Sequence, residues 1–133
     1  MRIGALVLFG ALALSQNASA APVTVACSLV DTSTYATRYI EVDQIVFDVE
    51  AQLVDMRSAK TVGTSDFVNW IFTTRKHGPF DDLFTMRGGA NWFTGGGVSN
   101  STPYAMKLTQ DGLFVMTYVY RGGTEVLRWQ CAG

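Results

Sequence analysis

The sequence predicts an all-β fold, a single small antiparallel up-and-down β-barrel or a strongly curled sheet of about seven to nine strands. Apolar and polar residues alternate with a period of two through much of the chain after residue 20, as in strands with one buried face. Asp111-Gly112 and Gly122-Gly123 lie between such runs and favour tight hairpin turns, because glycine readily adopts positive φ angles. The only two cysteines, Cys27 and Cys131, lie near opposite ends of the chain that follows residue 20.

The first twenty residues have the pattern of a secretory signal peptide. Arg2 precedes the apolar run 3–14, and the segment closes with the small-x-small sequence Ala18-Ser19-Ala20. We expect cleavage after Ala20, and we therefore expect a periplasmic or secreted protein.

The chain after this cleavage is one domain by size. Residues 21–133 number about 113, which is enough to bury a real core. The full chain has ten Lys and Arg and eleven Asp and Glu, without a basic run, so nucleic-acid binding is not expected. The apolar run 3–14 is too short to span a bilayer, and no later stretch is long and uncharged enough, so we expect no transmembrane segment.

The first half of the domain begins with the clearest alternation. Val23, Val25 and Cys27 share one face of the first predicted strand, and Asp43-Gln44 is interpreted as a hairpin turn further along. The predicted strands of this half cover residues 23–29, 38–42, 45–49 and 67–73.

Residues 48–60 allow two interpretations. Val49, Leu53 and Met56 fall at helical spacing among good helix formers, whereas Val49, Ala51 and Leu53 alternate as in a strand. We favour the strand because the neighbouring segments are strands.

The second half predicts a meander around the two glycine turns. Trp129 lies within an apolar alternation that also holds Leu127 and Cys131, and we place this ring in the core. The predicted strands of this half cover residues 92–93, 104–109, 113–120 and 125–131.

The cysteine pair predicts which strands are neighbours. Export and an even number of cysteines favour a disulfide between Cys27 and Cys131. A disulfide requires Cα atoms within about 7 Å, so the first and last strands should lie side by side, as barrel closure would place them.

No catalytic, cofactor or metal motif stands out. The lone His77 lies beside Asp81-Asp82 and is interpreted as a loop histidine; the pair Asp48 and Glu50 is interpreted as exposed strand residues, with a small hydrolase based on an acidic pair as the least favoured alternative. The run 95–97 of three glycines lacks the lysine and helix of a phosphate loop and is interpreted as a flexible connector. We expect no enzyme activity, no cofactor and no metal.

The segment from Gly88 to Tyr104 is the predicted interaction surface. It contains two glycine-rich stretches, the adjacent rings Trp92 and Phe93, and little charge after Arg87. Adjacent residues of a strand point to opposite faces, so one of the two rings is a candidate for an outward contact. The candidate binding residues are Arg87, Trp92, Phe93 and Tyr104.

The mature chain resembles small exported bacterial β-proteins of the C-type lysozyme inhibitor kind. Val25-Ala26-Cys27 near the start and Trp129-Gln130-Cys131 at the end carry the resemblance, which extends over the mature length as architecture. It implies a single antiparallel barrel that inhibits a cell-wall hydrolase. Of that family's Ser-Gly-x-x-Tyr loop, the stretch 100–104 matches only Tyr104.

The sequence as a whole predicts a small, exported, non-catalytic domain. We expect it to bind an envelope or extracellular protein, or a small ligand, through its loops; inhibition of a lysozyme is the alternative.

Overall fold

The computed structural model describes residues 21–59, 68–75 and 82–132, and these residues form ten β-strands and no helix. The strands are β1 (Val23–Thr32), β2 (Gln44–Asp48), β3 (Leu53–Ser58), β4 (Val68–Arg75), β5 (Asp82–Leu83), β6 (Thr85–Gly88), β7 (Phe93–Ser99), β8 (Thr102–Leu108), β9 (Leu113–Tyr120) and β10 (Gly123–Ala132).

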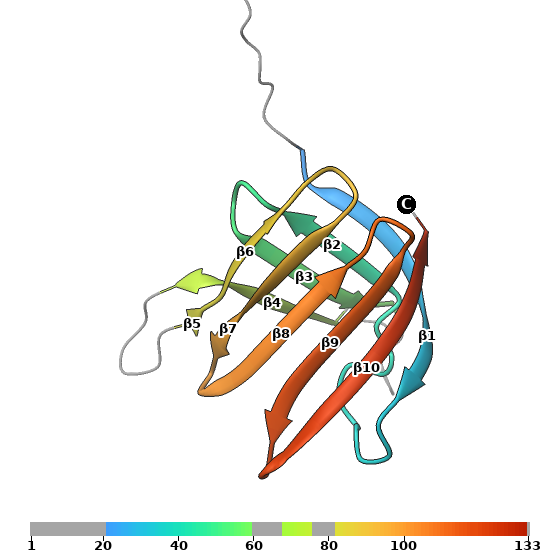
Figure 1. Ribbon diagram of the computed structural model, residues 1–133, viewed down its shortest axis with the longest axis vertical. Helices are drawn as coiled ribbons and strands as arrows, with labels where there is room; N and C mark the ends of the chain where they lie inside the picture. Colours follow the sequence, from blue (N-terminus) through green and yellow to red (C-terminus); the bar gives the residue numbers. More distant parts are fainter. Residues whose placement is uncertain (1–20, 60–67, 76–81, 133) are drawn as a thin grey trace, which may run out of the picture.

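The strands form a nearly closed antiparallel barrel (Figure 1), as the alternation predicted. Their order is β5-β4-β3-β2-β1-β10-β9-β8-β7-β6, so strands adjacent in sequence pair on both sides of the β1–β10 contact. Figure 1 shows β1 in blue beside β10 in red at one side of the molecule. The remaining break, which we call the seam, lies between β5 and β6, which follow each other without pairing.

The disulfide closes the barrel where the sequence predicted it. Cys27 of β1 lies opposite Cys131 of β10 in the antiparallel register, and the two are bonded with their Cα atoms 4.0 Å apart. Both cysteines are buried. The first and last strands are therefore neighbours, as the cysteine argument required.

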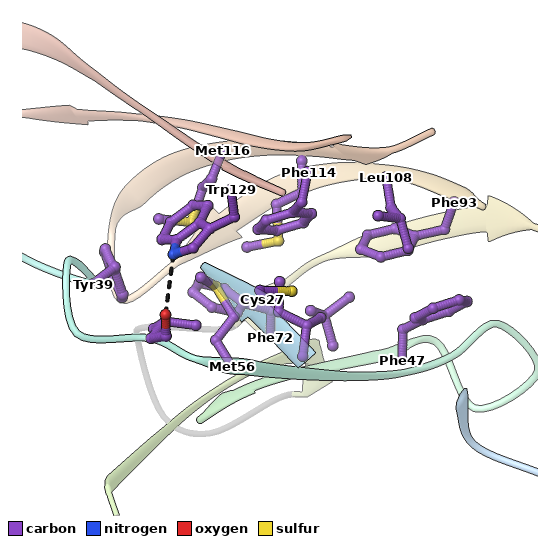
Figure 2. Packing of buried hydrophobic residues seen from close by; sticks show 14 of the residues in the cluster. Cys27, Tyr39, Phe47, Met56, Phe72, Phe93, Leu108, Phe114, Met116 and Trp129 are labelled. Atoms are coloured by element: carbon purple, nitrogen blue, oxygen red, sulfur yellow. Dashed lines mark hydrogen bonds between the residues drawn. The ribbon is translucent and has the colours of Figure 1, made fainter. Parts of the chain in front are cut away.

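The barrel interior is filled by side chains from all sides (Figure 2). A run of aromatic contacts crosses it, with ring centroids 4.8 Å apart for Phe47 and Phe93, 5.9 Å for Phe93 and Phe114, and 5.3 Å for Phe114 and Trp129. Trp129 is fully buried, and its Nε1 donates a hydrogen bond of 3.1 Å to the carbonyl oxygen of Val42. The core thus holds one face of nearly every long strand.

The predicted strand at residues 38–42 is wrong. This segment turns across one end of the barrel, with Tyr39 at φ 66° and the Val42 N–H donating to the Tyr39 carbonyl. Tyr39 and Val42 are both buried, so these two side chains cover the end of the barrel and do not form one face of a strand. Gln44 begins β2 and is therefore not part of a hairpin turn as predicted.

The described part of residues 48–60 contains a strand, which was the interpretation we favoured, and no helix. The Ala51 N–H donates to Asp48 Oδ1 over 3.0 Å, and Gln52 at φ 56° completes the turn that leads into β3. Turn and strand together account for the mixed pattern.

The two glycine turns are present, one of them displaced by a residue. Gly112, at φ 96°, lies in the turn between β8 and β9. Arg121 and Gly122 occupy the second turn at φ 53° and 79°, and Gly123 already pairs with Tyr120 as the first residue of β10.

The glycines at 95–97 form part of β7, so their interpretation as a flexible connector is wrong. A Cβ atom at Gly95 would lie 2.7 Å from Cζ of Phe84, and one at Gly97 would lie 1.9 Å from the carbonyl oxygen of Leu83. Gly97 also has φ +152°. β5 and Phe84 cross β7 so closely that only glycine leaves room.

Side chains bridge the seam at two places. The buried carboxylate of Asp82 accepts from the Asn100 N–H and from Arg75 Nη2, each over 3.0 Å. The amide of Gln52 accepts from the Met86 N–H over 2.8 Å and donates to the Met86 carbonyl over 2.7 Å. These bonds tie the β2–β3 turn and β5 to the other half of the barrel.

Candidate ligand-binding site

The four candidate residues lie in different environments. Arg87 is exposed on β6, opposite Thr94 of β7. Phe93 is fully buried in the core, whereas the adjacent Trp92 is half-buried. Tyr104 is half-buried too and contacts the core cluster. The adjacent rings of residues 92 and 93 thus lie in different environments, and Trp92 is the more exposed of the two.

Trp92 covers a glycine turn. The Gly89 N–H donates to the Trp92 carbonyl over 2.9 Å, and a Cβ atom at Gly89 would lie 2.6 Å from Nε1 of the indole. At Gly88 a Cβ atom would lie 2.3 Å from the Trp92 carbonyl oxygen. Gly88 and Gly89 therefore let the chain fold back under the ring.

Tyr104 belongs to a second cluster, near the β1–β2 loop. Its hydroxyl lies 2.8 Å from that of Tyr39, and its ring centroid lies 4.8 Å from that of Phe72 and 5.6 Å from that of Tyr118. Burial raises the pKa of Tyr39 well above its usual value, and the hydrogen bond with Tyr104 raises it further. The Tyr39 phenol therefore remains neutral at ordinary pH.

The β6–β7 turn, the start of β1 and the β2–β3 turn line a partly open cavity of about 580 Å³, which we call the end pocket. Gly88, Gly89 and Ala90 contribute one wall, so part of the predicted surface from Gly88 to Tyr104 lines it. The remaining lining residues are Ala21, Val23, Phe47, Asp48, Val49 and Glu50.

The walls of the end pocket are held in place by hydrogen bonds. Asp48 Oδ1 accepts from the backbone of Ala51, and Gln52 Nε2 donates to the Val49 carbonyl over 2.7 Å. The same Gln52 amide bonds both backbone groups of Met86 on β6. The two turns that face each other across the end pocket are thus fixed relative to one another.

The acidic residues weighed as a catalytic pair have different surroundings. Asp48 and Glu50 lie together at the rim of the end pocket, where Asp48 also accepts a bond from the backbone of its own turn. Asp82 lies at the seam, where its carboxylate accepts hydrogen bonds from Arg75 and Asn100. His77 and Asp81 lie outside the described residues.

Sequence reasoning did not single out Val23, Phe47 and Val49 as pocket residues. Each has the pattern of an ordinary core position on a strand, and only the meeting of β1 with the β2–β3 turn makes them a pocket wall.

Searches of the described part of the chain add two findings. No three side chains of His, Cys, Asp or Glu there come close enough together to hold a metal ion. Within the same residues we find no helix with the length and hydropathy needed to span a bilayer. Comparison of the chain with protein-family models and with curated proteins finds no match.

Proposed function

We propose that this protein is an exported, non-catalytic binding domain that holds a small apolar molecule in the end pocket. The observation that carries the proposal is the pocket itself. Its volume of about 580 Å³ lies within the range of small-molecule sites, roughly 300–1,000 Å³, and most of its lining residues are apolar.

The lining favours an apolar body in the ligand. Phe47, which is nearly fully buried, reaches the pocket with Val23 and Val49 beside it, while the backbone of Gly88 and Gly89 forms the opposite wall. Such a surface gains free energy when it is removed from water by a hydrocarbon group.

The rim favours a positive charge at one end of the ligand. Asp48 and Glu50 are the charged residues of the lining, and both are acidic. A carboxylate attracts a nearby cation and disfavours a nearby anion. The ligand class that we propose is therefore an apolar molecule with a cationic end group.

Export is part of the proposal and rests on the signal-like residues 1–20 and on the disulfide. A bond between Cys27 and Cys131 forms and persists in an oxidising compartment such as the periplasm or the extracellular space. Sequencing of the N-terminus of the exported protein should give Ala21 as the first residue. A retained Met1 would contradict export by this signal.

Two probes with the same apolar tail and opposite charge test the ligand class. We expect decyltrimethylammonium, titrated below its micelle concentration and followed by calorimetry, to bind more tightly than decanoate by at least about tenfold. Equal affinity for both would contradict the role of Asp48 and Glu50, and no binding of either would contradict the pocket as a site.

A pair of tryptophan variants locates the site. Ala90→Trp places a large ring at the pocket wall and should weaken binding of decyltrimethylammonium by about tenfold or more. Ala105→Trp places the same ring on the exposed face of β8, away from the end pocket, and should leave affinity unchanged. Equal effects of the two variants would contradict binding in the end pocket.

Inhibition of a C-type lysozyme is a second candidate, favoured by the disulfide-closed barrel that the resemblance implied. The matching residue, Tyr104, bonds the Tyr39 hydroxyl, so an inhibitory contact would use other residues as well. Titration of the protein against a C-type lysozyme should slow lysis stoichiometrically. No effect at a large molar excess would exclude this candidate.

A further inference from the structure

β4 has one edge that is only partly covered. Its residues from Val68 to Thr73 pair with β3, but on the other side β5 pairs only with Thr74 and Arg75. Among the described residues, no strand pairs with that side of Asn69 and Ile71.

The alternation of an antiparallel ladder shows which backbone groups face this edge. The Thr73 carbonyl accepts from the Phe84 N–H, so Thr73 faces the β5 side. In an extended strand the N–H and C=O of one residue point to the same side, and the side changes at each residue. Asn69 and Ile71 therefore also direct their N–H and C=O groups toward the open edge, while Trp70 and Phe72 direct theirs toward β3.

An aromatic cavity of about 270 Å³, which we call the edge pocket, lies beside these groups. It is lined by Asn69 and Ile71 from the edge itself, by Ser99 and Asn100 where β7 leads into the β7–β8 turn, by Arg38 and by four rings. Tyr39 and Trp70 meet edge to face with centroids 5.2 Å apart, and Tyr39 also bonds Tyr104 through its hydroxyl. The rings of the edge pocket are Tyr39, Trp70, Phe72 and Tyr104.

The charge at the edge pocket is positive. Arg38 is its charged lining residue, and the guanidinium of Arg38 lies 5.0 Å from the ring centroid of Tyr120. Contact with this ring, which lies outside the edge pocket, helps to hold the guanidinium in place. An occupant that carries a carboxylate would therefore gain from the charge of Arg38.

We propose that the open edge of β4 binds an extended, acidic peptide segment of a partner protein. The segment adds a strand beside Asn69 and Ile71 and bonds their N–H and C=O groups. One apolar or aromatic side chain of the segment enters the edge pocket, and an acidic side chain lies by Arg38. Main-chain bonds supply affinity in this mode of recognition, and alternate side chains supply specificity. This inference concerns a different place in the fold from the end pocket and does not depend on it.

The probe for this site is a peptide selected from a random library displayed on phage. We expect the disulfide-bonded protein to enrich peptides in which acidic residues flank an apolar or aromatic one. Synthetic copies of the enriched peptide then give affinities by fluorescence anisotropy. Absence of enrichment, or enrichment of basic peptides, would overturn the proposal.

Two arginine variants form a matched pair. Arg38→Glu should weaken binding of the selected peptide by about tenfold or more, because it reverses the charge at the edge pocket. Arg121 also lies over the Tyr120 ring, at 5.3 Å, but does not line the edge pocket, so Arg121→Glu should weaken peptide binding clearly less than Arg38→Glu does. Equal effects of the two substitutions would place the peptide elsewhere and overturn the proposal.

Amide hydrogen exchange tests the added strand directly. Peptide binding should slow exchange at the N–H groups of Asn69 and Ile71 and leave that of Trp70, which faces β3, unchanged. N-methylation of the central peptide residue should abolish this protection and weaken binding. Unchanged exchange at Asn69 and Ile71 would overturn the proposal. A dimer in sedimentation with those amides protected in the absence of peptide would also overturn it, in favour of a second copy of this chain.

Discussion

The indole Nε1 of Trp129 and the carbonyl oxygen of Val42 are joined by a hydrogen bond of 3.1 Å inside the barrel (Figure 2). Trp129 lies on the last strand, and Val42 lies near the end of the loop that crosses one end of the barrel. Both residues are buried, so neither polar group has water as an alternative partner. The bond therefore fixes the position of the β1–β2 loop over the core.

Trp129→Phe should lower the free energy of unfolding by about 1–3 kcal/mol, because it leaves the Val42 carbonyl buried without its donor. Urea denaturation followed by circular dichroism measures this change. Trp70→Phe is the matched control: Trp70 is half-buried, so its substitution should cost less. Equal losses would contradict a special role for the Trp129 bond.

Removal of the disulfide should lower the free energy of unfolding by more than loss of the Trp129 hydrogen bond. Cys27 and Cys131 are 104 residues apart, and closing a loop of this length restricts the unfolded chain by about 4–5 kcal/mol in the chain-entropy account. The double variant with alanine at both positions should therefore melt at a markedly lower temperature. A thiol assay of the unfolded wild-type protein without reductant should find no free thiol, and two free thiols would contradict the bond.

Gly97→Ala should destabilise the barrel by about 3 kcal/mol or more, because the new Cβ atom would meet the Leu83 carbonyl at 1.9 Å. Gly123→Ala provides the control, since its Cβ atom would lie 3.8 Å from the Tyr120 carbonyl, an ordinary contact. We expect that control to change stability by less than about 0.5 kcal/mol. Similar stabilities of the two variants in urea would contradict the close crossing of β5 and β7.

Phe93→Ala and Trp92→Ala should distinguish a core residue from an adjacent residue beside the end pocket. Phe93 is fully buried, so its loss should cost about 3–5 kcal/mol. Trp92 does not line the end pocket but is half-buried over Gly89, which does; its loss should cost about 1–2 kcal/mol and should weaken ligand binding by loosening that wall. Urea denaturation and titration with decyltrimethylammonium measure both effects. If Trp92→Ala destabilised the protein as much as Phe93→Ala, Trp92 would be an ordinary core residue.

Stability should fall in alkaline solution because of Tyr39. Burial, followed by the bond with Tyr104, raises the pKa of Tyr39 in the folded state above its unfolded value of about 10. The folded protein then retains a proton that the unfolded chain loses, so the stabilisation is complete below about pH 10 and decreases as the pH rises further. Urea denaturation between about pH 9 and pH 11 should show this decrease, and Tyr39→Phe should reduce the slope. An unchanged slope in that variant would contradict the assignment.

Strand alternation and the cysteine pair were sufficient to predict the barrel and its closure. Val25 and Cys27 on one strand, and Leu127 and Trp129 on another, repeat with a period that only a half-buried strand produces. Turn residues such as Gly112 then fix the hairpins, because their conformation is local.

The seam and the pockets depend on contacts between distant segments, which a local pattern does not contain. The role of glycine at residues 95–97 follows from Phe84 and Leu83 crossing β7. The end pocket needs the β2–β3 turn to meet the β6–β7 turn, and the Gln52 amide holds them together. Of the candidate site, only the glycine turn beside Trp92 was predictable.

The pairing of β1 with β10 determines the order in which the chain can fold. Among the strands that the structure describes, every other ladder joins strands that follow each other in sequence, so β1–β5 and β6–β10 are two meanders whose contacts have short sequence separation and form early. Closure of the barrel is the one step that brings the two ends of the domain together. Cys27 and Cys131 come within bonding distance only at that step, so the rate of thiol oxidation should report barrel closure and not the collapse of either meander.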